Sequence, residues 1–162
     1  MTPFRRILVP HDFSAHATRA LTLAAELAAP HGGRLLVLHV ITPFHPVTAV
    51  RDDVPAWGPA RDLVADERRR LEAVVRRVLV GRRRVRADCE VVIGDPFHRI
   101  ADAARRVDSI VMATAGRTGV AHLLIGSVAE KVVRHAPVPV LTVRPDARPR
   151  LRGAARRSVR RS

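Results

Sequence analysis

The residues of this chain best suited to binding an anion lie between Met112 and His135, in the segment MATAGRTGVAHLLIGSVAEKVVRH. This segment contains three glycines, and the last of them, Gly126, stands directly before Ser127 and a helical pattern. Glycine has no Cβ, so its backbone N–H group can approach a bound anion closely. A helix N-terminus adds unpaired N–H groups and a partial positive charge. The pattern therefore predicts a phosphate site at the start of this helix.

Two roles suit the hydroxyl of Ser127, and they are compatible. Ser127-Val128-Ala129-Glu130 has the sequence of a capping box, in which the serine accepts a hydrogen bond in the first turn and Glu130 reaches back. The same hydroxyl can donate its proton to a phosphate oxygen. The sequence leaves both open, a helix cap alone and a cap that also binds phosphate.

Five apolar segments alternate with four helical patterns along the chain. Parallel strands joined by right-handed crossovers are buried on both faces, which accounts for continuous apolar runs. The alternation predicts one α/β domain, a doubly wound five-stranded parallel sheet with helices on both faces. The five predicted strands are Ile7–Val9, Leu35–Leu38, Val91–Ile93, Ile110–Met112 and Val138–Val143.

Local signals place the helices between these strands. The first pattern runs from Ala17 to Ala28 and closes at Gly32-Gly33, which is typical of a C-terminal stop. The third begins at Asp95-Pro96, an N-cap acid followed by a proline at the first helical position. We expect a loop over Thr42 to Ala60, which contains four prolines. The second pattern has one apolar face, formed by Leu71, Val74, Val75 and Val78.

The net charge of +14 comes from 29 basic residues, of which Lys131 is the single lysine. We attribute the arginine excess to a general compositional bias, because it is spread over the whole chain. Seven of the arginines fall in residues 145–162, which we expect to form a basic, disordered C-terminal tail after a domain of residues 1–144. Such a tail favours association with nucleic acid or an acidic membrane by counterion release. It has no interleaved aromatic residues, so we favour a solubilising or partner-binding tail over nucleic-acid binding.

A single cysteine, Cys89, excludes an intramolecular disulfide, and its place in an apolar strand predicts a buried, reduced thiol. No apolar run approaches the roughly 18 residues of a membrane span, and residues 1–6 lead into a strand rather than a signal-peptide core. We therefore expect a soluble, cytoplasmic protein with no membrane partner.

Open sheets of this class bind ligands beyond the carboxyl ends of their strands, where the strand order reverses. Two turns are candidates, VPHDFSAHATRAL after the first strand and the glycine-bearing segment after the fourth. We expect the site where these two turns meet.

At these residues the chain resembles the universal stress protein family, over Arg5 to Arg144. The resemblance is carried by RRILVPHDFS, LLVLHV, GDPFHRIADAARR and, most specifically, GRTGVAHLLIGSVAEKVVRHAPVPVLTVR. It implies the strand order 3-2-1-4-5, two helices on each face, and a homodimer formed through strand 5, Val138–Val143. The order then reverses between strands 1 and 4, where the strand pattern alone places the site.

ATP-binding members of this family carry Gly-x2-Gly-x9-Gly-[Ser/Thr] after strand 4. Here the second glycine is Gly116, the third is Gly126, and the interval between them is intact. The first position is Ala113, and the position before the second glycine, commonly histidine in the family, is Ala115. The methyl of Ala113 costs ~1–3 kcal/mol if it meets the ligand, and almost nothing if it faces into the sheet.

The resemblance implies an adenine nucleotide, ATP accompanied by Mg²⁺, as a regulatory ligand that orders the loop from Gly116 to Ile125. Asp12 is either a nucleotide contact or a turn acid, and Val40 packs either on the adenine or in the core. Arg117 either meets a terminal phosphate or is solvated. The full set of candidate binding residues is Pro10, Asp12, Val40, Ala113, Gly116, Arg117, Gly126, Ser127 and Val128.

Motifs of catalysis are missing from the sequence. It has no Gly-x4-Gly-Lys-[Ser/Thr], no Gly-x-Gly-x-x-Gly and no Gly-x-Ser-x-Gly, and no general base stands out. The eight histidines form no His-Glu-x-x-His or similar ligand spacing, so we predict no structural metal. We expect a protein that is not an enzyme, with at most slow, incidental ATP hydrolysis. The alternative keeps the fold without a nucleotide, as an interaction module for an unknown protein partner.

Overall fold

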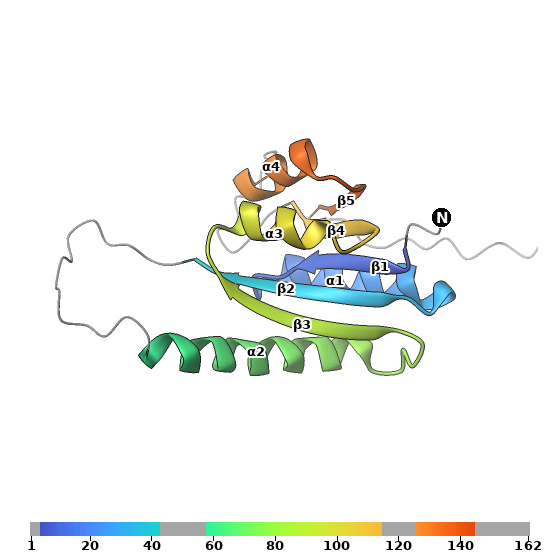
Figure 1. Cartoon of the computed structure of the whole chain (residues 1–162). Helices are drawn as coiled ribbons and strands as arrows, with labels where there is room; N and C mark the ends of the chain where they lie inside the picture. Colours follow the sequence, from blue (N-terminus) through green and yellow to red (C-terminus); the bar gives the residue numbers. More distant parts are fainter. Residues whose placement is uncertain (1–3, 43–57, 115–125, 145–162) are drawn as a thin grey trace, which may run out of the picture.

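The computed structural model describes residues 4–42, 58–114 and 126–144, and its centre is a five-stranded parallel sheet (Figure 1). The strand order is β3-β2-β1-β4-β5, and every neighbouring pair is parallel. This confirms the predicted fold class and strand order. The strands are β1 (Arg6–Pro10), β2 (Arg34–Ile41), β3 (Arg86–Ile93), β4 (Ser109–Ala113) and β5 (Val140–Val143).

Four α-helices and one short 3-10 helix connect these strands within the described ranges. They are α1 (Ala15–Ala28), η1 (Ala29–His31), α2 (Gly58–Leu79), α3 (Pro96–Ala104) and α4 (Ser127–His135). Helix α2 begins at Gly58, so the predicted loop extended three residues too far into it. Strand β5 begins at Val140 rather than Val138, since Pro139 has no N–H group to donate to a strand ladder.

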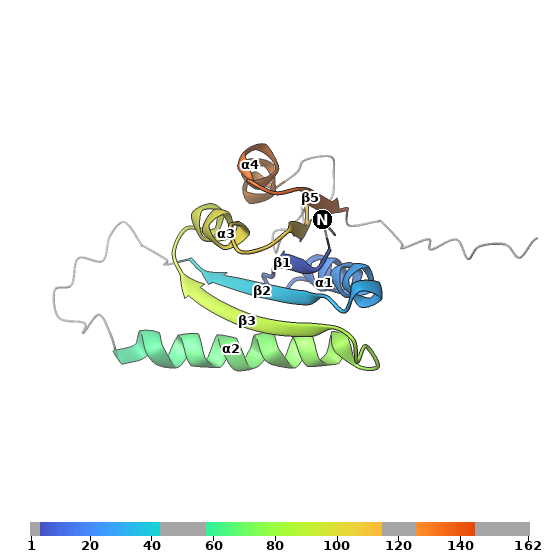
Figure 2. The same cartoon turned by 45° about the vertical axis from the view of Figure 1, so that its right-hand side comes forward.

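The helices form one layer on each face of the sheet, α1 and α2 on one face and α3 and α4 on the other (Figures 1 and 2). Successive side chains of a strand point to opposite faces of the sheet, so the core is divided into two clusters. Ile7 and Val9 of β1 pack in the cluster of α1 and α2, whereas Leu8 between them packs with α3 and α4. The central strands are therefore buried twice, as their apolar runs predicted.

Two helix starts follow the capping residues in the sequence. The Ser14 hydroxyl accepts a hydrogen bond from the Ala17 amide at 3.1 Å and caps α1. The Asp95 carboxylate accepts from the His98 amide at 3.0 Å and caps α3, with Pro96 at the first helical position as predicted. At the far end of α1, η1 closes on Gly32, whose φ of 59° lies in the left-handed region that favours glycine.

Strand β3 is an edge strand and is less buried than a central one. Cys89 on this strand is half-buried, where a fully buried thiol was predicted. Burial nonetheless raises the pKa of its thiol to about 11, so the protonated form dominates at neutral pH. Within the described ranges, no helix has the length and apolar character needed to cross a membrane.

Candidate functional site

A cavity of about 490 Å³ opens at the carboxyl edge of the sheet, a volume typical of small-molecule sites. It lies where β1 has β2 on one side and β4 on the other, which is the predicted point of reversal. Gly116 and Arg117 lie outside the described residues. The other seven predicted site residues all line this one cavity: Pro10, Asp12, Val40, Ala113, Gly126, Ser127 and Val128.

One end of the cavity is the N-terminus of α4. The N-cap is Gly126, in an extended conformation (φ −57°, ψ 149°), and its N–H donates to the Thr114 carbonyl at 2.7 Å. A Cβ on Gly126 would lie 3.2 Å from that same oxygen, so the position is closely packed. The first intrahelical hydrogen bond runs from the Glu130 amide to the Gly126 carbonyl. The amides of residues 127–129 precede it and have no acceptor within the helix.

The predicted capping box at Ser127 is wrong. Ser127 is the first helical residue rather than the cap, and the Glu130 carboxylate accepts from Arg134 at 2.9 Å instead of reaching back. The cause is the hydrogen bond that Gly126 donates to Thr114, which fixes Gly126 in the extended cap conformation and starts the helix one residue earlier than predicted. Ser127 is exposed, and its hydroxyl makes no capping bond. It is therefore placed to meet a ligand.

The side chain of Ala113 faces away from α4. Ala113 is the last residue of β4, and its methyl packs against the core cluster of α1 and α2. Its neighbour Met112 packs in the opposite cluster, with Ala129 of α4. Ala113 also lines the cavity, and its methyl lies on the face of the sheet opposite α4.

Asp12 is a turn acid in this structure. Its Oδ1 accepts from the Ser14 amide at 3.0 Å, and Ser14 rather than Asp12 caps the helix that follows. Phe13 between them has a φ of 65°, a left-handed conformation that is uncommon for this residue. Asp12 also lines the cavity, so its turn role and a ligand role are compatible.

Two buried histidines line the cavity, and the sequence reasoning did not include them among the site residues. His11 is 4% exposed; its Nδ1 accepts from the Phe13 amide at 3.1 Å, and its Nε2 lies 3.3 Å from the Thr18 hydroxyl. His39 on β2 directs Nδ1 at the His11 carbonyl, 2.7 Å away. Burial lowers the pKa of His11 to about 4, with smaller effects of Asp12, His39 and Arg70, so its imidazole is neutral at physiological pH.

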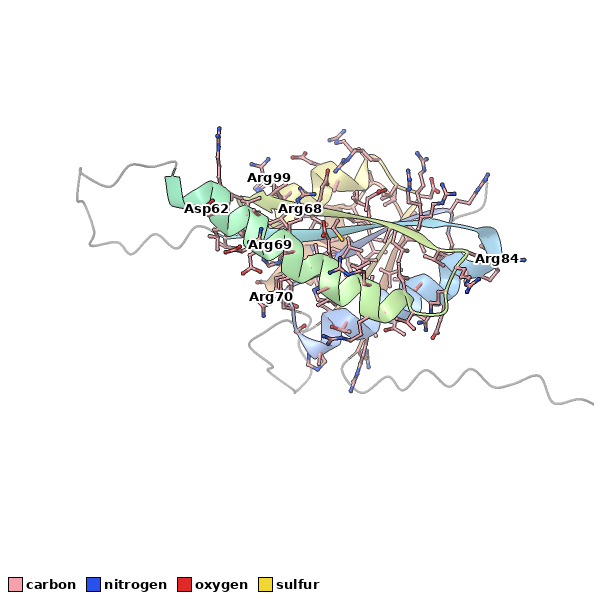
Figure 3. All side chains as sticks on the ribbon, turned by 90° about the horizontal axis from the view of Figure 1, so that it is seen from below. Asp62, Arg68, Arg69, Arg70, Arg84 and Arg99 are labelled. Atoms are coloured by element: carbon pink, nitrogen blue, oxygen red, sulfur yellow. The ribbon has the colours of Figure 1, made fainter. Side chains whose placement is uncertain are left out.

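The end of the cavity away from α4 receives Leu63 and Glu67 from α2. Three residues beyond Glu67, the Arg70 guanidinium lies over the Phe13 ring, 4.0 Å from its centroid. Figure 3 shows Arg70 on the side of α2 that faces α1, and Arg68 on the side of β3, where it donates to the Cys89 carbonyl at 2.8 Å. No sequence motif marks Glu67, which stands in the charged run ADERRR like an ordinary surface residue.

The position of Val40 is compatible with both of its predicted roles. It is half-buried near the end of β2, packs against the cluster of α3 and α4, and lines the cavity. Pro10 ends β1 at the same edge. Within the described part of the chain, no cluster of three or more His, Cys, Asp or Glu is close enough to hold a metal ion.

The universal stress protein family matches residues 3–144 of this chain. A universal stress protein of Thermus aquaticus is 39% identical over 145 residues, which cover 87% of this chain and 99% of that protein. The solved structure of universal stress protein UspA from Lactobacillus plantarum is similar with a TM-score of 0.69 and 28% identity, covering 87% of this chain and 98% of the other. A universal stress protein from Archaeoglobus fulgidus, solved in complex with dAMP, has a TM-score of 0.56 and 25% identity, with coverages of 85% and 95%.

Proposed function

The chain belongs to the universal stress protein family, and from this we propose that its cavity binds an adenine nucleotide, ATP with Mg²⁺, as a regulatory ligand. The observation that carries the proposal is the meeting of the cavity with the N-terminus of α4, where Gly126, Ser127 and Val128 line one end. Amides with no acceptor inside the helix, at its positive end, form a site for phosphate. The dAMP complex of the relative from Archaeoglobus fulgidus supports an adenine nucleotide as the ligand.

In this arrangement the phosphates bind at α4 and the nucleoside extends across β1 toward β2. The Ser127 and Val128 amides donate to phosphate oxygens, and the Ser127 hydroxyl, which is not used as a cap, donates a further hydrogen bond. Val40 contributes apolar surface for the base. Magnesium would be held mainly by phosphate oxygens and water, with the Asp12 carboxylate facing the nucleotide or its ion.

We propose binding without efficient turnover, because the sequence carries no nucleotide-hydrolysis motif and no evident general base. A regulatory ligand acts by favouring one conformation of its protein, which alters the surface available to a protein partner. A homodimer through β5 is part of the proposal. It is supported by the position of β5 at the sheet edge and by Leu141 on this strand, which is 40% exposed.

Isothermal titration calorimetry of the full-length chain with ATP and Mg²⁺ tests the proposal. We expect saturable heat and a rise in the midpoint of thermal unfolding that grows with ATP concentration, because a ligand that binds only the folded state stabilises it. Inorganic triphosphate alone is the control, since it lacks the base and should bind more weakly. Neither heat nor thermal shift at millimolar ATP would contradict nucleotide binding and favour the interaction module without a ligand.

A further inference from the structure

One buried carboxylate oxygen in the cavity wall has no hydrogen-bond partner among the described residues. It is Oε2 of Glu67, on the third turn of α2. A carboxylate oxygen removed from water without a hydrogen bond is unfavourable, so such an atom calls for an explanation. Glu67 lines the cavity, which makes a donor on the ligand the natural partner.

Arg70 does not fill this role. Its Nη1 lies 3.5 Å from Glu67 Oε2, close enough for an ion pair, but the contact is not a hydrogen bond. The Arg70 guanidinium is instead placed over the Phe13 ring, and its side chain is 59% exposed. Arg70 therefore offsets part of the charge of Glu67, while the acceptor capacity of the buried oxygen stays unused.

The position of Glu67 relative to α4 indicates which part of a nucleotide it meets. In the sheet, β1 separates β4, which leads to α4, from β2, and α2 packs against β2 and β3. A nucleotide with its phosphates at α4 therefore directs its base across β1, toward the end of β2 and toward α2. Leu63 of the same helix and Val40 and Ile41 near the end of β2 contribute apolar lining to the cavity, which suits the faces of a purine ring.

We propose that Glu67 Oε2 accepts a hydrogen bond from the exocyclic amino group of the bound adenine and thereby determines base preference. This inference rests on the proposed function. Asp12, another carboxylate in the cavity, already uses Oδ1 for the Ser14 amide, whereas the buried oxygen of Glu67 has no such bond. A hydrogen bond to a charged acceptor changes an affinity by roughly 10- to 150-fold. A keto oxygen at the same place on the base would face the carboxylate and be rejected.

The test measures the coupling between the amino group and the side chain by calorimetry on the full chain. ATP is compared with purine riboside triphosphate, in which hydrogen replaces the amino group, on the unmodified protein, Glu67→Gln and Glu67→Ala. We expect the unmodified protein to prefer ATP by at least ~10-fold, and Glu67→Ala to bind both ligands equally. Glu67→Gln retains the size of the side chain without its charge, and we expect an intermediate preference.

Glu72→Ala is the matched control. Glu72 lies on the same helix, pairs with Arg76 at 3.7 Å as Glu67 pairs with Arg70, is 42% exposed and does not line the cavity. Its removal should leave the preference for ATP unchanged. A purely structural role of Glu67 would lower the unfolding midpoint of the ligand-free protein in Glu67→Gln. We expect that midpoint to be unchanged or raised, because a buried carboxylate oxygen that accepts no hydrogen bond is replaced by an uncharged group.

Three outcomes overturn the inference in different ways. If ATP does not bind the unmodified protein, the proposed function fails and this inference fails with it. If ATP binds but Glu67→Ala keeps the full preference over purine riboside triphosphate, Glu67 does not contact the amino group, while the proposed function stands. If the coupling appears with 2′-deoxy-ATP or 3′-deoxy-ATP instead, the donor is a ribose hydroxyl and the assignment to the base is wrong.

Discussion

The two ends of the cavity are built from different parts of the polypeptide. At the α4 end the groups that point at a ligand are main-chain amides, ordered by the hydrogen bond between Gly126 and Thr114. At the α2 end the polar lining consists of side chains, such as His39 and Glu67, which come from separate elements of the fold. A main-chain site depends on backbone conformation and tolerates most side chains. A side-chain site tolerates backbone variation elsewhere but depends on residue identity.

This difference separates affinity from selectivity. Phosphate is common to all nucleotides, so the end of the cavity that binds phosphate through main-chain amides contributes affinity without distinguishing bases. The opposite end meets the part of the ligand that varies, and one carboxylate there is enough to separate an amino group from a keto oxygen. Substitutions at the two ends should therefore have different signatures, a uniform loss for all nucleotides at α4 and a change of rank order at α2.

The largest effect is expected for Ser127→Pro, which removes both the amide donor and the hydroxyl at the phosphate end. Proline is well tolerated at the first helical position, and the extended conformation of Gly126 (ψ 149°) is the one required before a proline. Loss of two donors to a charged phosphate should lower ATP affinity by ~100-fold. Calorimetry with ATP and GTP should show the same loss for both nucleotides.

Ser127→Ala is the matched variant, because it removes only the hydroxyl. We expect a decrease of about 10-fold, so that the difference between the two variants isolates the main-chain amide. Equal losses in Ser127→Pro and Ser127→Ala would mean that the amide is not used. Circular dichroism should show the same helix content in both variants.

The next effect concerns His11, which follows β1 and lines the cavity. Burial lowers its pKa from 6.5 to about 4, so the unfolded chain binds a proton in this interval that the folded protein does not. Stability supported by the neutral imidazole is therefore complete above pH 6.5 and is lost as the pH falls toward 4. Between pH 7 and pH 4.5 this group should account for a loss of about 2 kcal/mol in the free energy of unfolding.

Urea unfolding of the unmodified protein and of His11→Gln at pH 7, 5.5 and 4.5 measures this loss. Other titrating groups are common to both proteins, so the difference between their unfolding free energies reports on His11. We expect the unmodified protein to lose about 2 kcal/mol of unfolding free energy relative to His11→Gln between pH 7 and pH 4.5. A difference that stays constant with pH would show that the imidazole is not held neutral by burial.

The same division explains what sequence reasoning could reach. The strand order was implied by the resemblance to the family, whereas the α4 end follows from a local motif, since Gly126 and Ser127 are neighbours in the chain and their role depends on backbone geometry. Glu67 is brought to the site by tertiary packing of α2. The sequence around it does not differ from that of a solvent-exposed helix. The capping box failed for a related reason, because the Gly126 amide donates to the carbonyl of Thr114, which lies twelve residues earlier in the chain.

The smallest effect is expected for Ala113→Gly, which restores the glycine of the family motif. Because the methyl packs against the core of α1 and α2 while the phosphate end lies at α4 on the opposite face, its removal should change ATP affinity by less than about two-fold. It should lower the free energy of unfolding by ~0.5–1 kcal/mol, since glycine in a strand loses more conformational entropy on folding. Calorimetry and urea unfolding on the same preparation give both values. An affinity gain of ten-fold or more would place the methyl against the ligand, and the α4 end would then depend on a side chain after all.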